Sequence, residues 1–463
     1  METEDFRRHG HAIIDWLADY YRDIEGRRVV PQVVPGEIRA MLPTSAPEHG
    51  QPFDAILADF RDQIVPGMTH WGHPGWFAYF PANSSPPSVL GELLSAGLGA
   101  QCMSWETSPA ATELEQTVMS WYRQLLGLPD GFTGVIQDTA SSATLVAFLT
   151  ARERAGADPS RLVAYWSSEA HSAIPKAARI VGMPISHRRI VPVDRKFAMQ
   201  PDALDQMMAA DIANGLIPLI VVGTMGTTSS TACDPLRAIG EIAQNRHAWF
   251  HIDAAFGGSA AIVPEVRPLL NGVELADSMA TNPHKWLLTN FDCTAYFVRD
   301  VNALLQTFSI LPEFLRTKHD ENSAAVNFRD WGIPLGRRFR ALKLWFVFRS
   351  YGAEAIRNMI RGHIALGHEL ASWVDAEAEW ERLAPAPLAL VCLRHVPPAL
   401  RGDEPALDRH NAALLARVNA TGRVHLTHTT LAGQYAIRVA IGSFRTERRH
   451  VAELWELLKG VSS

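Results

Sequence analysis

Short apolar runs alternate with segments of helical periodicity between about residues 86 and 360. Four of these runs have the length and composition of buried strands: Leu162–Trp166, Leu216–Gly223, Trp249–Ile252 and Thr294–Val298. Strands that alternate with helices and are apolar on both faces predict a mostly parallel sheet covered by helices on each side. The pattern therefore predicts an α/β fold for the central part of the chain.

The two ends of the chain have different patterns. In residues 1–85, apolar side chains recur at helical spacing around Trp16 and again around Phe60, with several prolines between them. Such a segment has little core of its own, so we expect it to bury its apolar face on another surface. After residue 360, two strand-like runs, Leu388–Leu393 and Tyr435–Ala440, lie among helical segments. We therefore predict a helical arm (1–85), a large α/β domain (86–360) and a small α+β domain (361–463).

Composition narrows the classes of function. The chain has 463 residues, with 47% hydrophobic residues, 20% charged residues and a formal net charge of −6, which argues against a nucleic-acid binder. No apolar run approaches the roughly 20 residues that span a membrane, and the acidic N-terminus lacks the pattern of a secretion signal. The four cysteines lack metal-ligand spacing. We expect a cytoplasmic protein without a metal, membrane or nucleic-acid partner.

A lysine and an aspartate follow two of the predicted strands. Asp253 lies in His251–Ala255, after the run Trp249–Ile252, and Lys285 lies in Asn282–Trp286, after Ser278–Thr281. Pyridoxal phosphate needs this pair, because the amine forms a Schiff base with its aldehyde and the carboxylate keeps its ring nitrogen protonated. Alone, the lysine could be a solvated loop residue and the aspartate a helix cap. Together they predict a site that stabilises a carbanion.

A third segment could bind the phosphate of this cofactor. Gly134–Thr144 runs from a short strand into a helix that we expect to begin near Thr139. Hydroxyl groups and free backbone N–H groups at a helix start form an anion site. An ordinary helix N-cap is the alternative interpretation.

These motifs, with others along nearly the whole chain, resemble the pyridoxal-phosphate-dependent group II amino acid decarboxylases, most closely the aromatic L-amino acid decarboxylases. The other matching segments include Thr69-His70-Trp71, Phe77–Pro81, Ser108–Glu115 and Gly336–Trp345. The resemblance implies pyridoxal phosphate fold type I, similar to aspartate aminotransferase, and an obligate homodimer with sites at the interface. An aminotransferase or desulfurase would share the Lys/Asp pair but lack Thr69-His70-Trp71 and Gly336–Arg340.

The resemblance also assigns cofactor contacts. Lys285 would form the Schiff base, Asp253 would pair with the ring nitrogen, and His171 would stack on the ring. The remaining implied contacts are Thr139, Ala140, Ser141, Asn282 and His284 at the phosphate, and Thr228 and Ala255 at the ring.

The substrate pocket is likewise implied by the resemblance. The matching wall residues are Trp71, Tyr79, Phe80, Pro81, Gln101 and Met103. Gln101 and Met103 stand where the aromatic decarboxylases often carry isoleucine and phenylalanine, so the preferred aromatic side chain stays open. A basic cluster around Arg337 lies in an apolar helical pattern, which favours a structural role over a polyanion site.

Phe328 is the main departure from the decarboxylases, which carry tyrosine at this position on a loop over the active site. That tyrosine hydroxyl protonates the substrate carbon after carbon dioxide leaves, and phenylalanine has no such proton. The same change is characteristic of plant aromatic aldehyde synthases, so the resemblance favours dioxygen as a co-substrate and aldehyde, ammonia and hydrogen peroxide as products. The alternative is that His171 or water donates the proton and the enzyme is a plain aromatic L-amino acid decarboxylase that forms the amine.

Overall fold

A seven-stranded sheet forms the centre of the molecule in the computed structural model, which describes residues 1–310, 312 and 325–462. The strand order is β1-β7-β6-β5-β4-β2-β3, and the five strands from β6 to β3 are parallel, whereas β7 is antiparallel to β6 and β1. The strands are β1 (Thr133–Gln137), β2 (Leu162–Ser167), β3 (Arg188–Val191), β4 (Ile217–Thr224), β5 (Trp249–Asp253), β6 (Ser278–Thr281) and β7 (Thr294–Val298). The predicted mostly parallel sheet is confirmed.

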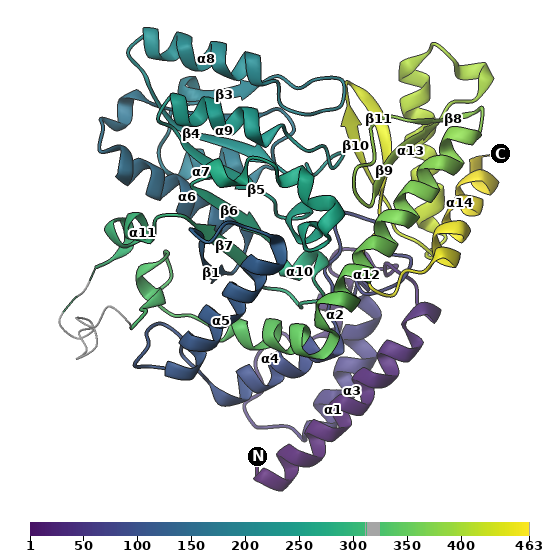
Figure 1. Cartoon of the computed structure of the whole chain (residues 1–463). Helices are drawn as coiled ribbons and strands as arrows, with labels where there is room; N and C mark the ends of the chain where they lie inside the picture. Colours follow the sequence, from purple (N-terminus) through teal and green to yellow (C-terminus); the bar gives the residue numbers. More distant parts are fainter. Residues whose placement is uncertain (311, 313–324, 463) are drawn as a thin grey trace.

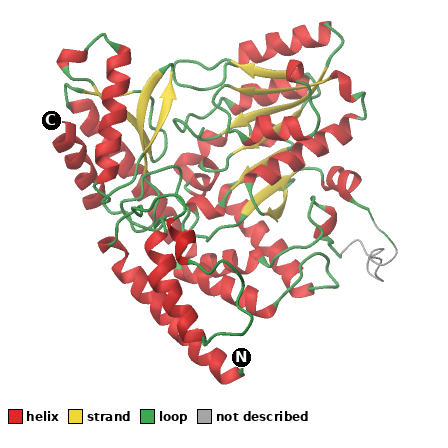
Figure 2. Cartoon of the chain, turned by 180° about the vertical axis from the view of Figure 1, so that it is seen from behind, coloured by secondary structure: helices red, strands yellow, loops and turns green. Residues whose placement is uncertain are grey.

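Helices cover both faces of this sheet, as Figures 1 and 2 show from opposite sides. Side chains of α6 (Ala140–Ala155), α7 (Ala173–Ile180) and α11 (Val301–Phe308) form one apolar cluster with one face. The second face packs against α5 (Pro109–Leu126), α8 (Pro201–Ala213) and α9 (Leu236–Asn245). Because both faces are buried, the strands have continuous apolar runs instead of polar alternation.

The C-terminal part forms a smaller lobe around a four-stranded antiparallel sheet of order β10-β11-β9-β8. Its strands are β8 (Trp380–Arg382), β9 (Leu390–His395), β10 (Thr427–Leu431) and β11 (Gln434–Ala440), and its helices are α13 (Glu404–Ala420) and α14 (Arg448–Ser462). The long α12 (Arg340–Ala376) joins it to the large sheet and is interrupted at Gly352, where φ is +70°. The predicted division after residue 360 falls inside α12.

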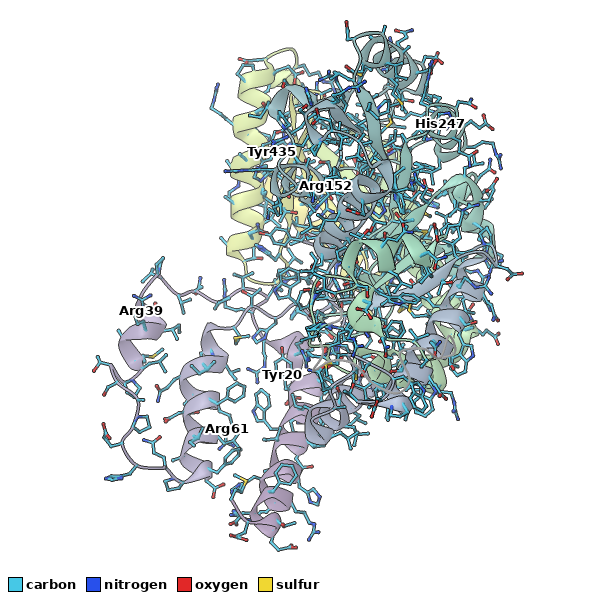
Figure 3. The ribbon with its side chains drawn as sticks, turned by 90° about the vertical axis from the view of Figure 1, so that its left-hand side faces the viewer. Tyr20, Arg39, Arg61, Arg152, His247 and Tyr435 are labelled. Carbon is cyan, nitrogen blue, oxygen red and sulfur yellow. The ribbon has the colours of Figure 1, made fainter. Side chains whose placement is uncertain are left out.

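The N-terminal segment projects away from the body of the molecule (Figure 3). It contains α1 (Thr3–Asp23), α2 (Glu37–Met41) and α3 (Phe53–Asp59), and α4 (Pro86–Leu98) follows it. His9 is the one buried residue of α1, so the arm leaves most of its surface open. Within the described ranges, no helix is both long enough and apolar enough to cross a membrane.

Candidate active site

Lys285 and Asp253 meet at one edge of the large sheet. Asp253 ends β5, and Lys285 lies in α10 (Pro283–Trp286), directly after the neighbouring parallel strand β6. Parallel neighbours place their carboxyl ends side by side, which is the usual position of ligand sites in such sheets. Both side chains line a small cavity of about 180 Å³, which we call the inner cavity.

The electrostatic environment suits Lys285 to act as a nucleophile. Burial lowers the pKa of its amine to about 8, and the positive charge of Arg438 acts in the same direction, whereas Asp253 opposes it. A neutral amine is the form that attacks an aldehyde. Its ammonium nitrogen also lies 5.1 Å from the centre of the Phe80 ring.

The Asp253 carboxylate is buried at the same cavity. Its Oδ1 accepts a hydrogen bond of 3.1 Å from the backbone N–H of Ala255, and the residue is only 5% exposed. Burying a charge is costly unless it gains a partner. A protonated ring nitrogen would supply one.

The beginning of α6 opens onto the inner cavity. Thr139 is the N-cap, and its Oγ1 accepts a hydrogen bond from the backbone N–H of Ser142. Thr139, Ala140 and Ser141 all line the cavity, as predicted for an anion site at a helix start. Asn282 lies beside them, where its Oδ1 accepts a 2.9 Å bond from Thr294.

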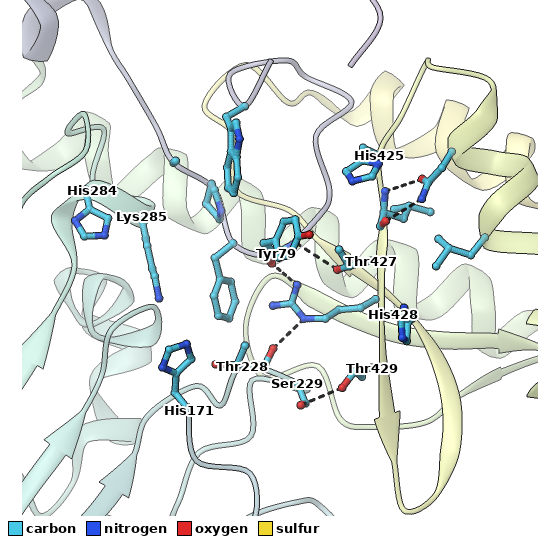
Figure 4. A pocket seen from close by; sticks show the side chains of 18 of the residues that line it. Tyr79, His171, Thr228, Ser229, His284, Lys285, His425, Thr427, His428 and Thr429 are labelled. Carbon is cyan, nitrogen blue, oxygen red and sulfur yellow. Dashed lines mark hydrogen bonds between the residues drawn. The ribbon is translucent and has the colours of Figure 1, made fainter. Parts of the chain in front are cut away.

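His171, Thr228 and Ala255 also line the inner cavity. The Nδ1 of His171 accepts a 3.1 Å bond from the backbone N–H of Ala173, and burial lowers the pKa of the imidazole. Figure 4 shows the side chains of His171 and Lys285 pointing toward each other. The imidazole can therefore stack on or exchange a proton with a group held between them.

A larger cleft of about 910 Å³ continues outward from Lys285 (Figure 4). Trp71, Tyr79, Phe80 and Pro81 line it, and the rings of Trp71 and Tyr79 stack with centroids 5.7 Å apart. The structure thus brings these four predicted wall residues together, and their contact with substrate stays a prediction. His284 lines this cleft and not the inner cavity, and its Nδ1 accepts a 3.0 Å bond from the backbone N–H of Cys293.

Three predicted site residues do not line either cavity within the same chain. Phe328 is 2% exposed and packs against Trp331 and beneath the guanidinium of Arg337, which lies 4.6 Å from its ring centre. Gln101 accepts a hydrogen bond from the backbone N–H of Arg337, and the carbonyl of Met103 accepts one from Arg329. Gln101, Met103 and Phe328 therefore lie outside the two cavities that Lys285 lines in its own chain.

Arg438 is a cleft residue that sequence reasoning missed. It is 3% exposed on β11, where its Nε donates to the carbonyl of Thr228 and its Nη1 to that of Tyr79. Its Nη2 has no hydrogen-bond partner among the described residues, and it lines the same cleft as Lys285. Such a group can bind a carboxylate. The available signal was an arginine inside the apolar run Tyr435–Ala440.

The chemistry of these groups fits pyridoxal phosphate. An amine of lowered pKa, a buried carboxylate and a helix start line one cavity, and these groups match the aldehyde, ring nitrogen and phosphate of the cofactor. Lys285, Asp253 and the Thr139–Ser141 segment would hold it.

Comparisons with known proteins agree with this geometry. The model of the pyridoxal-dependent decarboxylase conserved domain matches residues 35–396. The chain is 44% identical to phenylacetaldehyde synthase from Arabidopsis thaliana, over all of this chain and 97% of that protein. It is 43% identical to aromatic-L-amino-acid decarboxylase from Sus scrofa, again over all of this chain and 97% of the relative.

The solved structures give the same result. The crystal structure of Oryza sativa TDC with PLP and tryptamine superposes with a TM-score of 0.97 at 36% sequence identity, covering all of this chain and 98% of that one. This confirms the predicted pyridoxal phosphate fold type I and the predicted cofactor. The chain belongs to the pyridoxal-dependent decarboxylase family, among aromatic amino acid decarboxylases and aldehyde synthases.

Proposed function

We propose that this enzyme converts aromatic L-amino acids, dioxygen and water into the aromatic aldehyde, carbon dioxide, ammonia and hydrogen peroxide. The observation that carries the proposal is Phe328, a residue without an ionisable proton, at the position where the decarboxylases carry tyrosine. The similarity to phenylacetaldehyde synthase supports the same reaction. In this reaction the substrate loses its carboxyl group, and the electron pair left on its Cα reduces dioxygen to peroxide.

In this proposal the residues of the inner cavity bind the cofactor, and those of the larger cleft bind the substrate. When bound, pyridoxal phosphate withdraws electrons from the substrate Cα. Asp253 would hold the proton on the ring nitrogen, and Lys285 would hold the cofactor through its aldehyde. The aromatic wall of Trp71 and Tyr79 binds the substrate ring. The free Nη2 of Arg438 orients an anionic group of the substrate.

Phe328 changes the fate of the electron pair on Cα. A positioned general acid accelerates proton transfer by roughly 10²–10⁴-fold, so its absence slows the formation of amine by a similar factor. The electron pair on Cα then stays unprotonated long enough for dissolved dioxygen to react with it. The ratio of amine to aldehyde therefore depends on the relative rates of protonation and oxidation of Cα.

We also propose a homodimer in which each subunit completes the other's site. Four leucines on α4, at helical spacing, are 45% to 69% exposed: Leu90, Leu93, Leu94 and Leu98. Exposed leucines on one face of a helix are usually buried against another protein surface. Gln101, Met103 and Phe328 lie away from the Lys285 cavity of their own chain. A second copy that covers α4 would bring Gln101 and Met103 to the interface beside the opposite site. Phe328, which is buried against Trp331 in its own chain, would have to turn outward to reach that site.

Plain decarboxylation to the amine is the second candidate, and His171 favours it. The imidazole lines the same cavities as Lys285, and its Nδ1 is occupied by a backbone N–H. The remaining Nε2 could deliver a proton to Cα. If this transfer is fast, dioxygen has no role.

One incubation distinguishes the two candidates. Wild-type enzyme, Phe328→Tyr and Phe328→Leu are each supplied with phenylalanine, tyrosine, tryptophan and dopa, and carbon dioxide, amine, aldehyde, peroxide and dioxygen uptake are measured together. We expect wild type to consume dioxygen and form aldehyde and peroxide in similar amounts. The tyrosine variant should shift toward amine, whereas the leucine control, which also lacks a hydroxyl, should not.

The absence of peroxide would contradict the proposal. Amine in stoichiometric amount with carbon dioxide, without peroxide, from the wild-type enzyme would exclude the aldehyde reaction. The protein would then be a decarboxylase with another proton donor, and His171→Asn would be the next variant to test.

A further inference from the structure

The hydroxyl of Thr224 is an unsatisfied polar group beside the site. Thr224 is the last residue of β4 and is 4% exposed. Its Oγ1 is buried and has no hydrogen-bond partner within the described part of the chain. A buried hydroxyl without a partner is costly, so native proteins rarely keep one without a use for it.

The backbone around Thr224 is held rigidly. Its N–H donates a 2.8 Å bond to Oδ2 of Asp234, and its carbonyl accepts a 2.9 Å bond from the backbone N–H of Asp234. The other Asp234 oxygen, Oδ1, accepts from the backbone N–H of Met199 at 2.7 Å. The hydroxyl therefore sits on a fixed frame, and only its side-chain rotamer is free to change.

Thr224 is also the direct strand partner of Asp253. The two residues are paired in the register of β4 and β5, and both line the inner cavity. Paired residues of neighbouring strands project from the same face, and the strands are about 4.8 Å apart. A rotamer of Thr224 that turns the hydroxyl toward Asp253 would place it beside the carboxylate, whose Oδ1 accepts a bond from the backbone N–H of Ala255.

We propose that Thr224 is a positioning residue that donates a hydrogen bond to the Asp253 carboxylate when the cofactor is bound. The bond fixes the carboxylate in the orientation that receives the ring nitrogen and removes the cost of the unsatisfied hydroxyl. The inference rests on the proposed pyridoxal phosphate site, but it is independent of whether the product is aldehyde or amine.

The structure predicts opposite effects on the empty and the loaded protein. Thr224→Val keeps the shape of the side chain and removes only the hydroxyl. In the apoenzyme this removes an unsatisfied group, so the melting temperature should stay the same or rise. In the loaded enzyme it removes a hydrogen bond to a charged group, so the Kd for pyridoxal phosphate should rise by roughly 10- to 150-fold.

The experiment measures both quantities without substrate. Apoenzymes of wild type, Thr224→Val and Thr224→Ser are titrated with pyridoxal phosphate by fluorescence quenching, and their melting temperatures are recorded. The serine variant retains the hydroxyl and loses only a methyl group. It should bind pyridoxal phosphate within about threefold of wild type, because it can still donate the hydrogen bond to the Asp253 carboxylate.

Three outcomes would overturn the inference. They are a valine variant that binds the cofactor as tightly as wild type, a serine variant as weak as valine, and a valine apoenzyme that melts several degrees lower. The last would show that the hydroxyl has a structural partner in the empty protein. If instead no variant, including wild type, binds the cofactor, then the proposed site itself is wrong.

Discussion

The acidity of Lys285 gives a quantitative prediction about the active site. Burial lowers the pKa of its amine from 10.5 to about 8. At pH 7 the neutral fraction is then about 9%, compared with about 0.03% for an ordinary lysine, a gain of roughly 300-fold. The amine should therefore react with a rate that rises with pH and levels off above a midpoint near 8.

Asp253→Asn should move this midpoint in a known direction. The negative charge of Asp253 favours the charged form of Lys285 and so raises the pKa of the amine. Removing that charge while keeping the side-chain shape should lower the midpoint below 8. At pH 7 the amine of the variant should then react faster than in wild type, although the variant should hold the cofactor more weakly.

Competitive labelling of the apoenzyme with acetic anhydride measures the effect. Modification of each lysine is followed by mass spectrometry from pH 6 to 11, with the exposed Lys196 as the internal control. A midpoint for Lys285 at or above 10 would refute the burial argument. A midpoint that rises in Asp253→Asn would show that the two groups do not interact as the structure indicates.

Three further results are expected. Lys285→Ala should lose the visible absorbance of bound cofactor and nearly all turnover; borohydride-reducible cofactor on another lysine would contradict the assignment. Glu115→Gln should lower the free energy of unfolding in urea by about 3–5 kcal/mol, because Glu115 and Arg337 form a buried ion pair of 2.6 Å. A decrease of less than about 1 kcal/mol would show that the ion pair does not stabilise the fold. Leu93→Asp should give an inactive monomer by light scattering, whereas the control Ile185→Asp, at a more exposed apolar residue away from α4, should remain dimeric. A monomeric, active wild type would exclude the interface.

The local sequence was sufficient for most of the fold. The run Ser278–Thr281 is strand β6 with the predicted bounds, and the helix expected near Thr139 begins at Ala140 with Thr139 as its N-cap. These features depend on apolar periodicity and on capping, both of which act over a few residues. The order of the strands is not encoded in this way, because pairing joins residues far apart in the chain.

The division of the chain was less well determined. The change of pattern after residue 360 marks the new lobe, yet α12 continues from Arg340 to Ala376. A helix that serves two lobes has an apolar face toward each of them. Periodicity detects the helix but not which core each turn joins, so the domain limits remain predictions.

Sequence alone predicted the chemistry of the candidate site and determined that its two main residues meet, since Asp253 ends one buried strand, Lys285 follows its parallel neighbour, and parallel strands end at one edge. Tertiary structure decided what surrounds them. It brought Arg438 of the small lobe into the cleft and paired Thr224 with Asp253, and it placed Phe328 away from the Lys285 cavity of its own chain. Residue types specify what a group can do, whereas strand pairing and lobe packing decide which groups meet, because those contacts join residues that are distant in sequence.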